Sequence, residues 1–136
     1  KEHLQYDPVS DSVFGFIDTG KERKSQMGNS ALLVVLLGIT KYCVQPLSYI
    51  FSKSTVLADV LNDLIQDLIQ ELQAGNIFVK AVVCDQGASN QALSRNLQIS
   101  PSKPYFSVND CNVYFIFDPP HLMKTTRNLL SKHDLQ

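Results

Sequence analysis

The chain has 136 residues, of which 44% are hydrophobic and 18% are charged. This length suits one domain of ordinary size, and this composition excludes a disordered or collagen-like chain. Twelve basic residues against 13 acidic ones give a formal net charge of −1, so no global basic field indicates a nucleic-acid partner. A polyanionic partner would have to be held by a local group of residues.

The cysteines indicate the cellular compartment, and the length of the apolar runs indicates whether a membrane segment is expected. Cys43, Cys84 and Cys111 are odd in number and lack CxxC spacing, which predicts buried, reduced thiols in the cytosol or nucleus. The longest apolar run, 31–37, is far shorter than the roughly 18 residues of a membrane helix, so we expect no membrane segment. The chain opens without a methionine and stops just after a helical pattern, and we therefore expect it to be a fragment.

The first third of the chain has the pattern of strands. Residues 3–6 and 13–17 alternate around a turn cluster and predict a hairpin whose second strand ends at Asp18. The polar stretch 19–30 predicts a mobile basic loop. Apolar runs at 31–39 and 43–51 predict two more strands, and Pro46 inside the second run removes a backbone donor. That strand is therefore expected at a sheet edge or at a bulge.

A long amphipathic helix follows, because the hydrophobic period changes after Ser54. We expect Ser54 or Thr55 to cap its start and Gly75 to occupy the position just after its end. Apolar residues recur at steps of three and four, with acidic residues between them. The apolar positions are Leu57, Val60, Leu61, Leu64, Ile65, Leu68, Ile69 and Leu72.

The remaining elements alternate between strands and helices. Such alternation favours parallel pairing of the later strands, whereas the early strands with short connections should be antiparallel. We therefore predict an α/β fold with a ribonuclease-H-like (RNase H-like) mixed sheet, antiparallel early strands, a parallel later strand and flanking helices. Other three-layer α/β folds share parts of this order of elements. The expected elements are a strand at 77–84, a turn at 85–90, a helix at 91–98, a hairpin of 105–108 and 112–117 around Asn109 and Asp110, and a helix at 121–131 opened by Pro119 and Pro120.

Asp18 and Asp85 each follow an apolar strand-like run. In α/β sheets the ligand crevice lies at the carboxyl ends of the strands, where such side chains are presented together. If their strands are parallel neighbours, the two carboxylates meet and can bind one or two divalent cations. The structural alternative is that aspartate commonly ends a strand or opens a turn.

Two further segments have both chemical and structural interpretations. The loop 85–90 exposes backbone N–H groups that can hold a phosphate, but it lacks the known nucleotide-binding spacings and also fits a plain strand-to-helix turn. Asp118 can cap the last helix, and His121 can lie over the same sheet end as Asp85. The cations of that helix, Lys124, Arg127 and Lys132, can meet phosphates or simply face solvent.

Together these segments resemble the catalytic region of the P-element transposase family, including its THAP-domain relatives. The resemblance implies an RNase H-like domain that uses a DDE/D triad with Mg²⁺ for DNA strand cleavage and transfer. It also implies a GTP-binding insertion, an N-terminal zinc-containing DNA-binding domain and a nuclear location. The segments that carry it are Tyr6-Asp7-Pro8, Phe14-Gly15-Phe16-Ile17-Asp18-Thr19-Gly20, Gln45-Pro46-Leu47-Ser48-Tyr49, Val83-Cys84-Asp85-Gln86-Gly87-Ala88-Ser89-Asn90, and Phe117-Asp118-Pro119-Pro120-His121-Leu122-Met123-Lys124 with Arg127-Asn128.

Carried over to this sequence, the resemblance makes Asp85 the second acid and Asp18 the first, both as catalytic metal ligands. An acid upstream of Lys1 is the alternative for the first position, and the third acid is expected after the insertion. Asp118 and His121 then border the site. Residues 1–117 would form the truncated catalytic core, and 118–136 would begin the helix toward the GTP-binding insertion.

The expected partners of the full-length protein are transposon and target DNA and further copies of itself. The fragment alone should be inactive. Two other functions compete with this one. One is a nucleotide-binding α/β module that uses the loop 85–90, and the other is a catalytically dead transposon relic that serves as an interaction domain.

Overall fold

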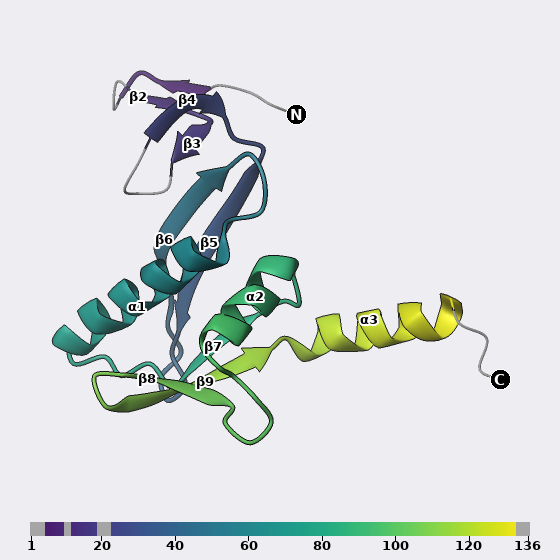
Figure 1. The fold of residues 1–136 in the computed structure, drawn as a ribbon. Helices are drawn as coiled ribbons and strands as arrows, with labels where there is room; N and C mark the ends of the chain where they lie inside the picture. Colours follow the sequence, from purple (N-terminus) through teal and green to yellow (C-terminus); the bar gives the residue numbers. More distant parts are fainter. Residues whose placement is uncertain (1–4, 10–11, 19–22, 133–136) are drawn as a thin grey trace. The chain divides into compact units, whose positions relative to one another are not determined.

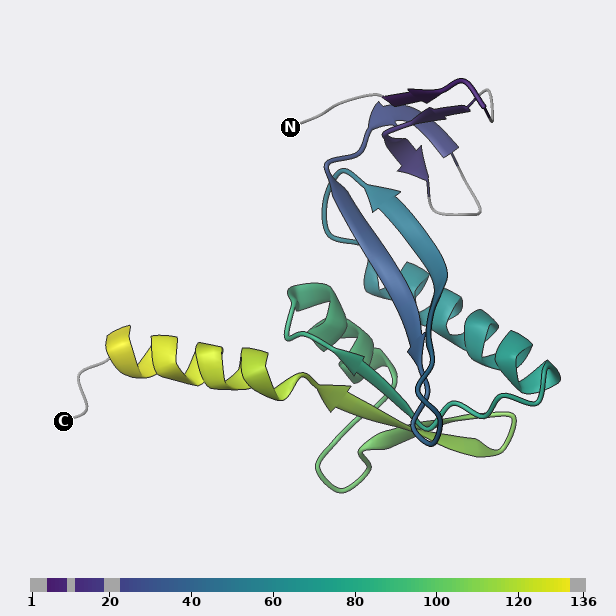
Figure 2. The ribbon, with the colours of Figure 1, turned by 180° about the vertical axis from the view of Figure 1, so that it is seen from behind.

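A computed structural model describes residues 5–9, 12–18 and 23–132 of the chain (Figure 1). The chain divides into two compact units, Lys1–Val56 and Leu57–Gln136, and each is described by itself. Figure 2 gives the reverse view. Residues 3 and 4 of the predicted first strand and residues 19–22 of the predicted loop lie outside the described residues. None of the described helices is long and apolar enough to cross a membrane.

The first unit consists of strands that pair only in antiparallel fashion. β1 and β2 form the predicted hairpin, and a four-stranded sheet has the order β4-β3-β6-β5. Gly15 has a φ of 109°, which favours glycine, and it divides the predicted strand 13–17 into β2 and β3. The strands are β1 (Gln5–Asp7), β2 (Ser12–Phe14), β3 (Phe16–Asp18), β4 (Arg23–Met27), β5 (Ser30–Leu37) and β6 (Val44–Ser52).

The prediction of a loop over 19–30 is wrong for Arg23–Met27, which forms the edge strand β4. Its register against β3 places Lys24 opposite Ile17 and Arg23 opposite Asp18. Four of its five residues are exposed. An edge strand tolerates exposed charge and often carries it to discourage pairing with other chains, so polarity did not exclude a strand here.

The hairpin of β5 and β6 confirms the expected bulge. Val34 pairs with Ser48 while Val35 pairs with Pro46, so Leu47 is the extra residue of β6. The irregularity lies next to the proline that cannot donate to the ladder. Cys43, which precedes β6, is exposed, and the prediction of a buried thiol is wrong there.

The second unit contains a small mixed sheet and three helices. Its strand order is β7-β9-β8, with β7 parallel to β9 and β8 antiparallel to β9, visible in both views (Figures 1 and 2). The predicted parallel later strand is therefore confirmed. The elements are α1 (Ala58–Ala74), β7 (Ala81–Cys84), α2 (Ala88–Asn96), β8 (Tyr105–Val108), β9 (Cys111–Phe117) and α3 (Pro119–Lys132).

The core of the second unit joins α1 and α2 to the sheet. α1 packs against α2 and β8. Gln73 of α1 donates to the Val108 carbonyl at 3.2 Å and accepts from the Asn109 amide at 2.9 Å. Asn109 and Asp110 have φ values of 47° and 60°, as a two-residue hairpin turn requires, and the predicted hairpin is confirmed. The buried hydrophobic residues are Leu61, Ile69, Leu93, Phe106, Val108, Val113 and Phe115.

The termini of α1 differ from the predictions. Leu57 occupies the N-cap position without a side-chain cap, so neither Ser54 nor Thr55 caps the helix. At the other end Gly75 is the C-cap with φ −85°, and Asn76 takes the left-handed conformation with φ 60°. The Ile77 and Asn76 N–H groups then donate to the carbonyls of residues 72 and 73, which is the Schellman arrangement.

Candidate functional site

Two aspartates follow the parallel strands β7 and β9 directly. Cys84 and Phe117 are register partners at the strand ends, and the Asp118 N–H donates to the Cys84 carbonyl at 2.8 Å. Asp85 and Asp118 thus stand next to each other at the carboxyl end of the pair, where α/β sheets commonly bind ligands. This sheet end of the second unit is a candidate functional site, and it contains Asp85 as the sequence predicted.

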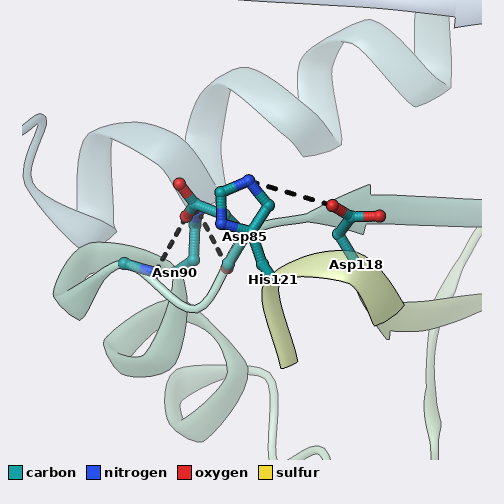
Figure 3. Close-up of polar contacts among 5 residues, drawn as sticks. Asp85, Asn90, Asp118 and His121 are labelled. Carbon is teal, nitrogen blue, oxygen red and sulfur yellow. Dashed lines mark hydrogen bonds and ion pairs between the residues drawn. The ribbon is translucent and has the colours of Figure 1, made fainter. Parts of the chain in front are cut away.

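The Asp85 carboxylate is held by the turn that follows it (Figure 3). Its Oδ1 accepts a hydrogen bond from the Gly87 N–H at 2.8 Å and another from the Asn90 side-chain amide at 2.8 Å. Both bonds use the same oxygen. The carboxylate is therefore oriented through Oδ1.

These hydrogen bonds also set the charge of Asp85. The Gly87 N–H, and after it the Asn90 amide, lower the pKa of the Asp85 carboxyl below its ordinary value. Partial burial opposes this effect, while His121 adds a smaller lowering of the same pKa. Donors that stabilise the charged form of a carboxyl lower its pKa, so Asp85 is ionised at neutral pH.

Gly87 is required for space and not for its conformational freedom. Its φ of −56° is open to any residue, but a Cβ there would lie 2.9 Å from Asp85 Oδ1. Its N–H is also already bonded to Asp85. This bond argues against the phosphate-loop interpretation of 85–90, because the Gly87 N–H already donates to Asp85 and is not available to a phosphate.

The first turn of α3 brings His121 to this sheet end. The Asp118 carbonyl accepts from the Leu122 N–H at 3.1 Å, which places Asp118 at the N-cap position as predicted. His121 Nε2 lies 3.9 Å from Asp118 Oδ2, and both side chains are partly exposed. Figure 3 shows one nitrogen of the His121 imidazole facing the Asp118 carboxylate.

Cys84 is the last residue of β7 and directly precedes Asp85. Burial, and after it the negative charge of Asp85, raises the pKa of the Cys84 thiol to about 11. This side chain is therefore a neutral thiol at physiological pH when no metal is bound.

Asp18 lies in the other unit, as the last residue of β3. It is half-buried, and its register partners are Arg23 in β4 and Phe51 in β6. The described strands do not include a parallel pair of β3 and β7, because β3 pairs with β4 and β6 while β7 pairs with β9. The strand pairing on which we based a meeting of Asp18 and Asp85 is thus not found, and their joint role stays a prediction.

The donor set at Asp85 fits one ligand of a hard cation. An ionised carboxylate with one oxygen oriented by the protein suits Mg²⁺, which is commonly bound through one or two carboxylates. Among the described residues, no group of three or more His, Cys, Asp or Glu side chains gathers to hold a metal. In such a site Asp85 would be one ligand, and the further ligands would have to come from other residues.

Sequence comparison places the chain in a family. Residues 1–98 match the family described as TNP-like, RNase H N-terminal domain. The chain belongs to this TNP-like RNase H family. No curated protein matches it.

Structure comparison gives a matching result. A solved structure, the Drosophila P element transposase strand transfer complex, is similar with a TM-score of 0.71 and 28% sequence identity. The match covers 93% of this chain and 26% of that chain. The TNP-like chain thus has an RNase H-like mixed α/β fold, and it resembles the P-element transposases.

Sequence reasoning found Asp85 but missed the residues that hold it. Asn90 had no assigned role, although an amide five residues after an acid can reach back across a strand-to-helix turn. Gly87 was interpreted as part of a phosphate loop or of a plain strand-to-helix turn, without a contact to Asp85. The signal for both was the compact order Asp-Gln-Gly-Ala-Ser-Asn, in which the donors follow the acid within five residues.

Proposed function

We propose that this chain is part of a DDE/D-type DNA transposase that carries out metal-dependent DNA strand cleavage and strand transfer. The proposal is supported above all by the Asp85 carboxylate, which is oriented and ionised at the carboxyl end of a parallel strand pair. Membership of the TNP-like RNase H family and the similarity to a strand transfer complex support it further. The chain covers 26% of that relative, so the complete activity belongs to a longer protein.

In this proposal Asp85 and Asp18 are the protein ligands of Mg²⁺. The bound ion would polarise the scissile phosphate and stabilise charge on the attacking and leaving oxygens. Gly87 and Asn90 keep the Asp85 carboxylate oriented through Oδ1. In cleavage, water forms the new P–O bond and the 3′ oxygen leaves. In strand transfer, a DNA 3′-hydroxyl takes the place of water.

Several finer features belong to the same proposal. A third acid beyond this chain would complete the triad. The full-length protein would carry a GTP-binding insertion after Asp118 and a THAP-type DNA-binding domain, and it would act in the nucleus as a homo-oligomer on transposon and target DNA. The family resemblance supports these features as a set.

A single substitution in the full-length protein tests the role of Asp85. Asp85→Asn keeps the size of the side chain but removes its charge, and we expect cleavage of a labelled transposon end to fall at least about a hundredfold, since loss of a few kcal/mol of stabilisation has that effect. The matched control is Asp110→Asn, because Asp110 is an exposed turn residue with φ 60° that asparagine adopts readily. Unchanged cleavage in Asp85→Asn with normal DNA binding would reject the proposal.

A further inference from the structure

The last helix of the chain, α3, is a local concentration of positive charge. Lys124, Arg127 and Lys132 lie within its 14 residues, and the helix contains no aspartate or glutamate. The whole chain has a net charge of −1. α3 is therefore positively charged, whereas the rest of the chain carries a net negative charge. A polyanion is attracted to this helix more than to the other elements taken together.

Basic and polar side chains of α3 are arranged as a row that includes the cations Lys124 and Arg127. His121, Lys124 and Asn128 are spaced by three and four residues, which places them on one helical face, and Arg127 lies three residues after Lys124. All four side chains are exposed. The Arg127 guanidinium donates to the Asn128 side-chain oxygen at 3.4 Å, so the two polar groups stand together.

The row begins at the candidate active site. α3 starts directly after β9, whose end adjoins the end of β7 through the bond from Asp118 to Cys84. His121 in its first turn is close enough to Asp85 for its charge to lower the pKa of that carboxyl. A phosphodiester at Asp85 would therefore lie at one end of this row.

We propose that this face of α3, formed by His121, Lys124, Arg127 and Asn128, binds the phosphate backbone of duplex DNA on one side of the scissile position. The inference rests on the proposed function and adds a DNA contact surface to it. From residue 121 to residue 127 the helix rises about 9 Å. One strand of B-DNA presents a phosphate about every 3.4 Å along its axis, so the row can meet two or three phosphates.

The geometry favours a polymer over a free nucleotide. A nucleoside triphosphate is held by donors that converge on one cluster of phosphates, as at a glycine-rich loop. The side chains of α3 instead follow one another along an exposed face, and each would meet a different phosphate. Such contacts position a duplex without reading its sequence.

The test measures how salt changes binding of the 136-residue chain to a labelled duplex, in EDTA so that no metal at Asp85 contributes. The test variant is Lys124→Gln/Arg127→Gln, because glutamine is neutral and forms helices well. The matched control, Lys80→Gln/Lys103→Gln, removes two exposed cations of the same unit outside α3. Circular dichroism confirms that each variant is folded.

We expect the test variant to bind the duplex roughly tenfold more weakly or worse near physiological salt. The slope of log affinity against log salt concentration should fall by about 1.8, because each lost phosphate contact removes about 0.9. The control should keep the slope of the unaltered chain, and excess GTP should not displace the duplex. An equal loss in both variants, or displacement by GTP, would overturn the proposal.

The DNA-binding test of α3 and the cleavage test of Asp85 can fail separately. If α3 binds DNA but Asp85→Asn cleaves normally in the full-length protein, the proposed active site fails and the contact surface stands. If Asp85→Asn abolishes cleavage while the α3 variant binds DNA normally, the contact surface alone is rejected.

Discussion

The two aspartates predicted to share a site have different surroundings. Asp85 is followed by a turn whose Gly87 N–H and Asn90 amide both bond to one carboxylate oxygen. Asp18 ends an antiparallel strand and stands opposite Arg23 of the edge strand β4. Both aspartates follow an apolar strand. Hydrogen-bond donors orient the Asp85 carboxylate, whereas Asp18 is the cross-strand neighbour of a cation. Strand-end position alone does not define a metal ligand.

The largest expected effect is on strand cleavage by the full-length protein, and it shows whether Asp18 is a metal ligand or a structural partner of Arg23. If Asp18 is the other metal ligand, Asp18→Asn should lower strand cleavage at least about a hundredfold, as Asp85→Asn does. Its matched control is Arg23→Gln, which removes the cross-strand cation and should leave cleavage within about twofold. Equal, small effects of both substitutions would instead make Asp18 a structural partner of Arg23.

A substitution at Gly87 tests the orientation of Asp85 without changing its charge. In Gly87→Ala the new Cβ would lie 2.9 Å from Asp85 Oδ1, and the turn or the carboxylate must shift. We expect cleavage by the full-length protein to fall roughly tenfold to a hundredfold, the range found when groups that orient ligands are lost. Gly75→Ala is the control, because a Cβ there meets its nearest atom at 3.4 Å, an ordinary contact distance.

The Asn90 amide should have a smaller effect that is visible in a titration. Asn90→Ala removes a donor to the ionised form, so the pKa of Asp85 should rise toward its ordinary value. Carbon-detected NMR of the Asp85 carboxyl across pH 2 to 6, a range of about four units around the reference value, measures this shift. A pKa unchanged from that of the unaltered chain would mean that the amide does not stabilise the carboxylate.

The same hydrogen bonds have a defined pH dependence. A carboxyl whose pKa is lower in the folded state stabilises the fold above its unfolded-state pKa and loses this contribution as pH falls through the folded value. The Asp85 contribution should therefore be constant from pH 7 to about 5 and decline below about 4. Denaturant unfolding of Asp85→Asn should show a shallower acid-dependent loss than the unaltered chain.

The elements that could be predicted from the sequence are those set by the preferences of neighbouring residues along the chain. The Asn109-Asp110 turn, the bulge beside Pro46 and the long amphipathic helix each follow from a backbone preference or a period, and each is present. The parallel pairing of β7 also followed from the alternation of strands and helices. These features depend on neighbours in the sequence.

The features that were missed depend on neighbours in space. β4 is polar but gains its partner from β3, and no periodicity indicated it. Asn76, and not Gly75, takes the left-handed position after α1, because the helix ends one residue later than the glycine suggested. The role of Gly87 became visible only from the distance between its missing Cβ and Asp85.

Binding of a divalent cation by Asp85, as we propose it, can be measured with Mn²⁺ in place of Mg²⁺. Titrating the 136-residue chain with Mn²⁺ should broaden the amide NMR signals of residues 85–90, Asp118 and His121 first, and Asp85→Asn should abolish this selective broadening. Broadening centred on the acidic face of α1 at Asp59 and Asp63, or broadening unchanged in Asp85→Asn, would contradict the account.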